Sequence, residues 1–231
     1  LLDTDDTQAC LELLENWDEA LPSWPLLQVR ILQARGEQDQ ALAVLGELSD
    51  PRQAAAQERQ SIGNLLILAR LQHQAGMQDA ALASVEQAWS AFEETEEGHR
   101  QSTLRSLFEA CATLGQFDTI LTRAAPLPAE EQAQAVAALI KAAQLDSALN
   151  LLAPINDALY STTYSELMDL TLALPPIDNA LRLLDKAPDR DRYSLLLSLL
   201  NHLAAQGQTA EAEALLLTLE PEPSQHPGLM L

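Results

Sequence analysis

Apolar residues recur every three or four positions along most of the chain, the spacing that places them on one face of an α-helix. Residues 61–76, 103–115 and 192–207 each carry such a stripe, and each segment ends at a glycine. Runs in which Val, Ile or Thr alternate with polar residues, the mark of β-strands, are missing from the sequence. The pattern therefore predicts an all-α fold.

A short string recurs where these stripes end. Around Gly36 it consists of a glycine, an aspartate three residues later (Asp39) and an alanine two residues further on (Ala41). Related strings put the aspartate position at 7, 39, 79, 118, 146, 178 and 210, at intervals of 28 to 40 residues. Glycine takes the left-handed conformation that ends a helix, and aspartate accepts hydrogen bonds from the free amides that begin the next one. Each string therefore predicts a tight turn between two helices.

Counting a helix on either side of each turn gives thirteen helices, one near residues 5–17 and then six helical hairpins. Prolines, which helices tolerate only before or within their first turn, separate the hairpins. They are Pro22 and Pro25, Pro51, Pro126 and Pro128, Pro154, Pro188 and Pro221. In the fifth hairpin Pro175 and Pro176 occupy the turn. We expect one helical repeat domain over residues 1–219 and a Pro-rich acidic tail or linker over 220–231.

The pattern resembles the tetratricopeptide repeat (TPR), a 34-residue helix–turn–helix unit. The second hairpin carries the best match, in which consensus-like positions hold Leu65, Leu68, Ala69, Gly76, Ala81 and Ala88. The sequence departs from the family in its uneven spacing and in its large aromatic positions, most of which hold Leu or Val. The resemblance implies a right-handed superhelical solenoid of about six hairpins, whose concave groove is lined by the first helix of each.

Counting back from the turns, the resemblance implies a set of groove residues that would contact a partner. They are Arg30, Gln33, Arg70, His73, Arg105, Glu109, Asp169 and Asn201. Arg30, Arg70 and Arg105 would form a basic strip suited to an acidic or C-terminal peptide, because guanidinium binds carboxylates through two hydrogen bonds. Alternatively, these arginines pair with neighbouring acids, as Arg105 would with Glu109 at a four-residue helical step.

Further along the chain, the predicted groove becomes apolar. After Asp118 the predicted groove positions hold Ala133, Ala137 and Ile140. Such a surface either binds an amphipathic helix or packs against the next part of the solenoid.

Charge and composition narrow the possible functions. The formal net charge of −21 argues against direct binding to nucleic acid, which needs clustered Lys and Arg. It fits either a basic partner or the need of a Leu- and Ala-rich solenoid for a soluble surface. No apolar run is long enough to span a membrane. Residues 1–20 lack the basic start of a signal peptide, and Cys10 and Cys111 lie too far apart to pair, so we expect a cytoplasmic protein.

Motifs for catalysis are missing from the sequence, and its four histidines lack the spacing of metal ligands. We therefore expect no enzyme activity, no cofactor and no metal. The predicted function is that of a scaffold or adaptor that holds a peptide or helix of a partner protein in its groove. The alternative is a regulatory helical arm that packs against its own module in a larger protein, since the helix near 5–17 has no preceding partner. The oligomeric state stays open.

Overall fold

A computed structural model describes residues 24–48, 61–93 and 100–218. Within these ranges every regular element is a helix and no strand occurs, which confirms the all-α prediction. The helix expected near 5–17 and the tail expected at 220–231 lie outside the described residues. The α-helices are α2 (Trp24–Ala34), α3 (Gln38–Leu48), α5 (Ile62–Gln74), α6 (Gln78–Glu93), α7 (Arg100–Thr113), α8 (Phe117–Ala124), α9 (Ala129–Lys141), α10 (Leu145–Leu152), α11 (Ser161–Leu172), α12 (Asp178–Lys186), α13 (Asp189–Ala205) and α14 (Thr209–Thr218), and a 3₁₀ helix, η2, covers Ala153–Ala158.

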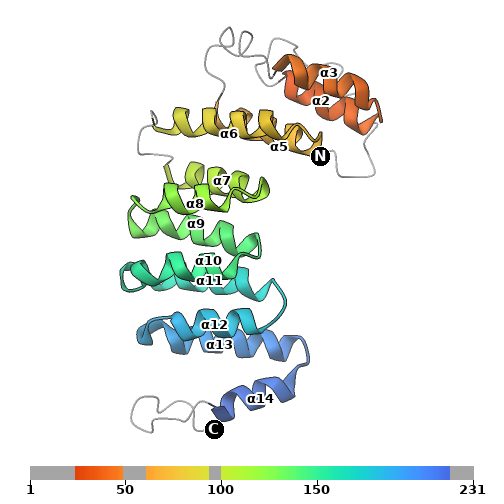
Figure 1. Cartoon of the computed structure of the whole chain (residues 1–231). Coiled ribbons are helices and arrows are strands. Elements are labelled where there is room, and N and C mark those ends of the chain that lie inside the picture. Colours follow the sequence, from red (N-terminus) through yellow and green to blue (C-terminus); the bar gives the residue numbers. More distant parts are fainter. Residues whose placement is uncertain (1–23, 49–60, 94–99, 219–231) are drawn as a thin grey trace. The chain divides into compact units, whose positions relative to one another are not determined.

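Consecutive helices pack in pairs (Figure 1). The chain forms two compact units, one up to Pro126 and one from Leu127. The first unit contains the pairs α2–α3, α5–α6 and α7–α8, and the second contains α9–α10, α11–α12 and α13–α14. In every pair the two helices are joined by one of the tight turns that the recurring string predicts.

Five of the turns that the structure describes share one backbone geometry. Each is closed by a residue with positive φ, and the four glycines at these positions have φ between 71° and 78°. They are Gly36, Gly76, Gly115 and Gly207; in the remaining turn Ala143 takes φ 58°. The amide of this residue donates to the carbonyl three residues back and the next amide to the carbonyl five residues back, at 2.8–3.1 Å. This is the Schellman motif, which satisfies the carbonyls left free at a helix end.

The aspartates of the recurring string do not cap the following helices at α8 and α10. There the N-cap residues are Gln116 and Gln144, and neither makes a side-chain capping bond. Asp118 and Asp146 lie two residues further on, inside the first turn. The predicted capping bond is wrong at these two helices, because the two-residue turn leaves the aspartate already helical. Its charge still lies at the positive end of the helix dipole.

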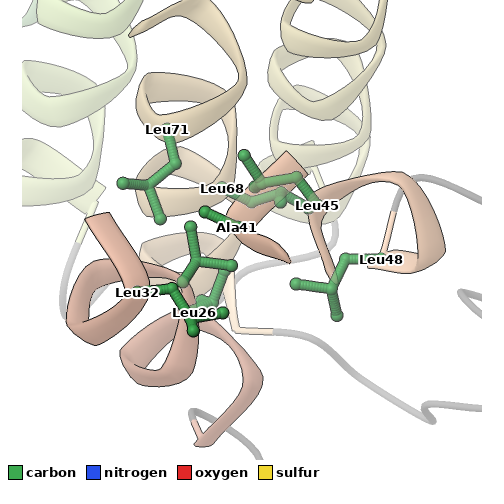
Figure 2. Packing of buried hydrophobic residues seen from close by; sticks show 8 residues of the cluster. Leu26, Leu32, Ala41, Leu45, Leu48, Leu68 and Leu71 are labelled. Atoms are coloured by element: carbon green, nitrogen blue, oxygen red, sulfur yellow. The ribbon is translucent and has the colours of Figure 1, made fainter. Parts of the chain in front are cut away.

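The core of the first unit joins the first pair of helices to α5 (Figure 2). The apolar side chains that meet there are Leu26, Val29 and Leu32 from α2, Ala41, Leu45 and Leu48 from α3, and Leu68 and Leu71 from α5. Two of them, Ala41 and Leu45, follow the turn by five and nine residues. One pair of helices therefore buries its second helix against the first helix of the next pair.

The same two positions are buried in five of the helices that follow a turn. Five residues after the closing position stand Ala41, Ala81, Ile120, Ala148 and Ala180, all at most 1% exposed. Nine residues after it stand Leu45, Val85, Ala124, Leu152 and Leu184, all at most 7% exposed. For the pair α11–α12 the closing position is Pro175, which a cis peptide bond joins to Pro176. Small residues dominate the first position, as expected where two helices approach closely.

A polar cluster holds α11 against α13 in the second unit. The carboxylate of Asp191, only 2% exposed, accepts hydrogen bonds from the Ser161 hydroxyl and from Nε of Arg190. Near it, the Tyr164 side chain is fully buried and its hydroxyl has no hydrogen-bond partner. Burial, together with the negative charges of Asp191 and Asp157, raises the pKa of Tyr164 to about 12, although Arg190 opposes this shift.

We expect Ala143→Gly to raise the free energy of unfolding by about 0.5–1 kcal/mol, because glycine takes positive φ without the steric cost that Ala143 bears. Gly115→Ala is the matched control and should lower the free energy of unfolding by a similar amount. A Cβ at Gly115 would have no atom within 4 Å, so this change tests the backbone alone. Urea denaturation measures both variants, and shifts of the same sign would contradict the strain argument.

We expect Tyr164→Phe to stabilise the protein by about 1 kcal/mol at pH 7, because it removes a buried hydroxyl without a partner. The advantage should grow at alkaline pH. An unfolded tyrosine loses its proton near pH 10, whereas the folded one holds it to about pH 12, so wild-type stability falls as pH rises through this window. By pH 11 the gap between variant and wild type should widen by roughly a further 1 kcal/mol. Denaturant titrations from pH 8 to 11 measure this difference in the free energy of unfolding, and a difference that stays constant over that range would contradict the raised pKa of Tyr164.

Candidate functional site

Three helices of the first unit carry charged residues at equivalent positions. Arg30 on α2, Arg70 on α5 and Glu109 on α7 each lie six residues before the glycine that closes the helix. Helix α5 contacts both α2 and α7. Because the same register on neighbouring helices points to the same side, this face of the unit carries two arginines and a glutamate.

A hollow of about 400 Å³ lies between α5 and α7. Its residues are Gly63, Leu66, Ile67, Ala69 and Arg70 on the α5 side, and Ser106, Glu109, Ala110, Thr113 and Leu114 on the α7 side. Most of these side chains are apolar or small, and Arg70 and Glu109 are the titratable ones among them. The hollow therefore combines an apolar floor with one cationic and one anionic group, within the volume range of ligand pockets.

Arg70 is an exposed charged side chain of this hollow. Neither Arg70 nor Arg30 has an ion-pair or hydrogen-bond partner for its guanidinium among the residues that the structure describes. This is unusual in a chain where Asp and Glu outnumber Lys and Arg by 34 to 13, so that acids are available nearly everywhere. Arg105 is also exposed and lies one turn before Glu109 on α7.

The other predicted groove residues of this unit have structural contacts. Nδ1 of His73 lies 2.8 Å from Oε1 of Gln78, across the turn that joins α5 to α6. Nε2 of the same glutamine donates to the Leu114 carbonyl at 3.5 Å, which ties the turn to the end of the α7 segment. Gln33 is half-buried, and its backbone carbonyl accepts the amide of Gly36. The contacts of His73 and Gln33 are thus structural, at the turns beside the charged face.

Two of the predicted site residues belong to the second unit. Asp169 on α11 and Asn201 on α13 are both exposed, and these two helices contact each other. The structure brings Arg70 and Glu109 to one hollow; it does not bring Asp169 and Asn201 to that hollow, whose residues all belong to the first unit.

Of the two interpretations of the apolar positions Ala133, Ala137 and Ile140, the structure supports packing against neighbouring helices and not an open binding surface. Ala133 and Ile140 are each only 2% exposed, and Ala137 is half-buried. Helix α9 contacts both α10 and α11, so its apolar side chains are used in the interior of the second unit. Alanine-rich helices have narrow side chains, which lets neighbours approach from two sides and cover them.

One cluster that the sequence did not reveal centres on Arg123. Its guanidinium forms ion pairs with Glu86 at 2.9 Å and with Glu93 at 3.0 Å, and lies 5.2 Å from the centre of the Trp89 ring. The Trp89 indole N–H donates to the thiol of Cys111 at 3.4 Å. Burial raises the pKa of the Cys111 thiol, against the effect of this hydrogen bond, so the residue stays neutral. The cluster joins α6, α7 and α8 and acts as a support for the unit.

Among the described residues, no three His, Cys, Asp or Glu side chains come together as a metal site would require. None of the described helices has the length and apolar character needed to cross a bilayer.

Comparison with known proteins assigns no family: no protein-family model, no curated protein and no solved structure matches the chain. The candidate site therefore has to be interpreted from its own geometry and charge.

Proposed function

We propose that this chain is a protein-interaction scaffold that binds a segment of a partner protein at the hollow between α5 and α7. The observation that carries the proposal is Arg70, an exposed guanidinium at this hollow that forms no ion pair or hydrogen bond with a described acid. A carboxylate of the partner would pair with Arg70, since guanidinium forms its strongest hydrogen bonds with carboxylates. Arg30 and Arg105, on the two neighbouring helices, extend the basic strip in either direction.

The apolar floor of the hollow supplies the other half of the recognition. Leu66 and Leu114 are nearly buried, while Ile67 and Ala110 are half-buried and accept further contact. A hydrophobic side chain of the partner would fill this floor beside the carboxylate bound to Arg70. Such apolar anchors supply most of the affinity at protein interfaces, and charges at the rim mainly supply selectivity.

Binding fits this site better than catalysis. Its titratable side chains are Arg70 and Glu109, and an arginine stays protonated at any physiological pH. We further propose that the six helix pairs are degenerate repeats of the tetratricopeptide kind, stacked as a right-handed solenoid; the five equal turns and the two buried positions after them support this. The cytoplasm is the proposed compartment, because the free thiol of Cys111 suits a reducing environment.

Affinity capture with the full chain tests the proposal. Wild type is compared with Arg30→Glu/Arg70→Glu/Arg105→Glu and with a control of equal charge change, Lys141→Glu/Arg182→Glu/Lys186→Glu, whose residues are exposed on the second unit. We expect wild type and the control to capture the same partner. The affinity of the first variant for this partner should be lower by about tenfold or more, equivalent to about 1.4 kcal/mol. Circular dichroism checks that all three proteins are folded.

A neutral substitution separates the hollow from the charge around it. Ser106 lines the hollow, and its hydroxyl donates to the Ser102 carbonyl one turn back. Ser106→Trp should fill the hollow and remove the same partner, whereas Ser90→Trp should not. Ser90 is an equally exposed serine on α6 with the same type of bond, to the Glu86 carbonyl. If every variant captures the partner as wild type does, binding occurs elsewhere and the proposal fails.

A further inference from the structure

Helix α14 leaves uncovered the two positions that the other turn-following helices bury. Counted from Gly207, these positions are Ala212 and Leu216. Ala212 is half-buried and Leu216 is 44% exposed, whereas the equivalent residues in the five other helices are at most 7% exposed. None of residues 209–216 is buried. The sequence of α14 thus keeps the apolar stripe of its counterparts, and no described element covers it.

The covered counterparts indicate which shape fits this stripe. The stripe of α3 is covered by α5, and Figure 2 shows Ala41 and Leu45 of this stripe meeting Leu68 of α5. Helices α6 and α12 likewise contact the helices that follow them, α7 and α13. In these three cases the neighbouring element is an α-helix. The complement of the α14 stripe is therefore an α-helix with an apolar face.

A second apolar surface borders the stripe. A hollow of about 370 Å³ lies between α12, α13 and α14. Its apolar residues are Ile177, Leu181, Leu199, Leu203, Ala214 and Leu215. Leu215 lies three residues after Ala212, a spacing that puts the two side chains side by side on the helix, so a helix lying on the stripe would reach this hollow with its larger side chains.

The charges around this surface are acidic. The hollow is lined by Asp178 and Glu211 and by no basic residue, and Glu213 is exposed on the same helix. After Arg192 the sequence contains no Lys or Arg at all. A second copy of this chain, with its net charge of −21, would bring further acid to this surface, and so would residues 219–231, which contain Glu220 and Glu222. Charge complementarity therefore favours a partner with basic residues.

We propose that the stripe of α14 and the hollow beside it bind an amphipathic helix of a partner protein, with an apolar face and flanks rich in Lys and Arg. This surface belongs to the second unit, shares no residue with the α5–α7 hollow, and selects a partner of the opposite charge. The chain would then hold an acidic segment at one surface and a basic helix at the other. Helix-in-groove binding of this kind uses apolar anchors at three- and four-residue spacing.

Fluorescence anisotropy with the full chain tests the proposal. The probe is a labelled helical peptide of about four turns, made of Leu on one face and Lys on the other, at about 0.15 M salt to limit non-specific attraction. Leu216→Gln should weaken its binding by about tenfold or more. The matched control is Leu42→Gln, because Leu42 on α3 has a similar exposed fraction, 39%. The affinity of this control variant for the probe should change by less than about twofold.

Four outcomes would overturn the proposal. The two Gln variants could bind the probe equally, or a Leu and Glu peptide with the same apolar face could bind as well as the Leu and Lys peptide. Self-association of wild type that Leu216→Gln removes would identify a second copy as the occupant. Stronger probe binding after Leu229, Met230 and Leu231 are replaced by Gln would identify the C-terminal segment instead.

Discussion

The left-handed residue that closes the first helix of a pair is the constraint on which the rest of the structure depends. In five of the six described pairs it reverses the chain within two residues and sets the register of the second helix; in the pair α11–α12, Pro175 stands at this position instead. The fifth and ninth residues after the turn are buried in five of the second helices, and most of these residues are alanine or leucine. The positions of Arg30, Arg70 and Glu109, counted back from the same residue, follow from it as well.

The two surfaces described above arise from this arrangement in different ways. The α5–α7 hollow forms where two first helices meet with small residues between them, Gly63 on one and Ala110 on the other. The α14 surface arises where a second helix carries the usual apolar stripe and no described element covers it. One surface is a gap in a completed contact, and the other is a contact with one side missing. The partners we propose for them differ accordingly: a segment with an apolar side chain and a carboxylate for the first, and an amphipathic helix for the second.

Turns and helices were predictable from sequence because their signals are local. Four turns are marked directly by a glycine, at Gly36, Gly76, Gly115 and Gly207. The turn at Ala143 is marked by Asp146 and Ala148, which follow it at the same spacing. The exact start of each helix was less predictable: Asp118 was expected to cap α8 but lies two residues inside it, and a shift of two residues decides between the two positions. Whether Ala133 and Ile140 line an open surface or are buried depends on which helices pack against α9, and hydrophobic periodicity does not encode those contacts. Likewise Arg123 meets acids 30 and 37 residues away, and no local pattern marks such pairs.

Part of the variation in length lies at the far end of the second helices. Helix α6 has 16 residues, while α8 and α10 have 8 each. All three begin from the same turn and bury the same fifth and ninth positions, so the added length lies beyond the contacts that position the pair. At the level of the gene, insertions and deletions at the ends of these helices would leave the turn and the packing register unchanged. Such a chain can change its length, one helical turn at a time, without having to rebuild its core.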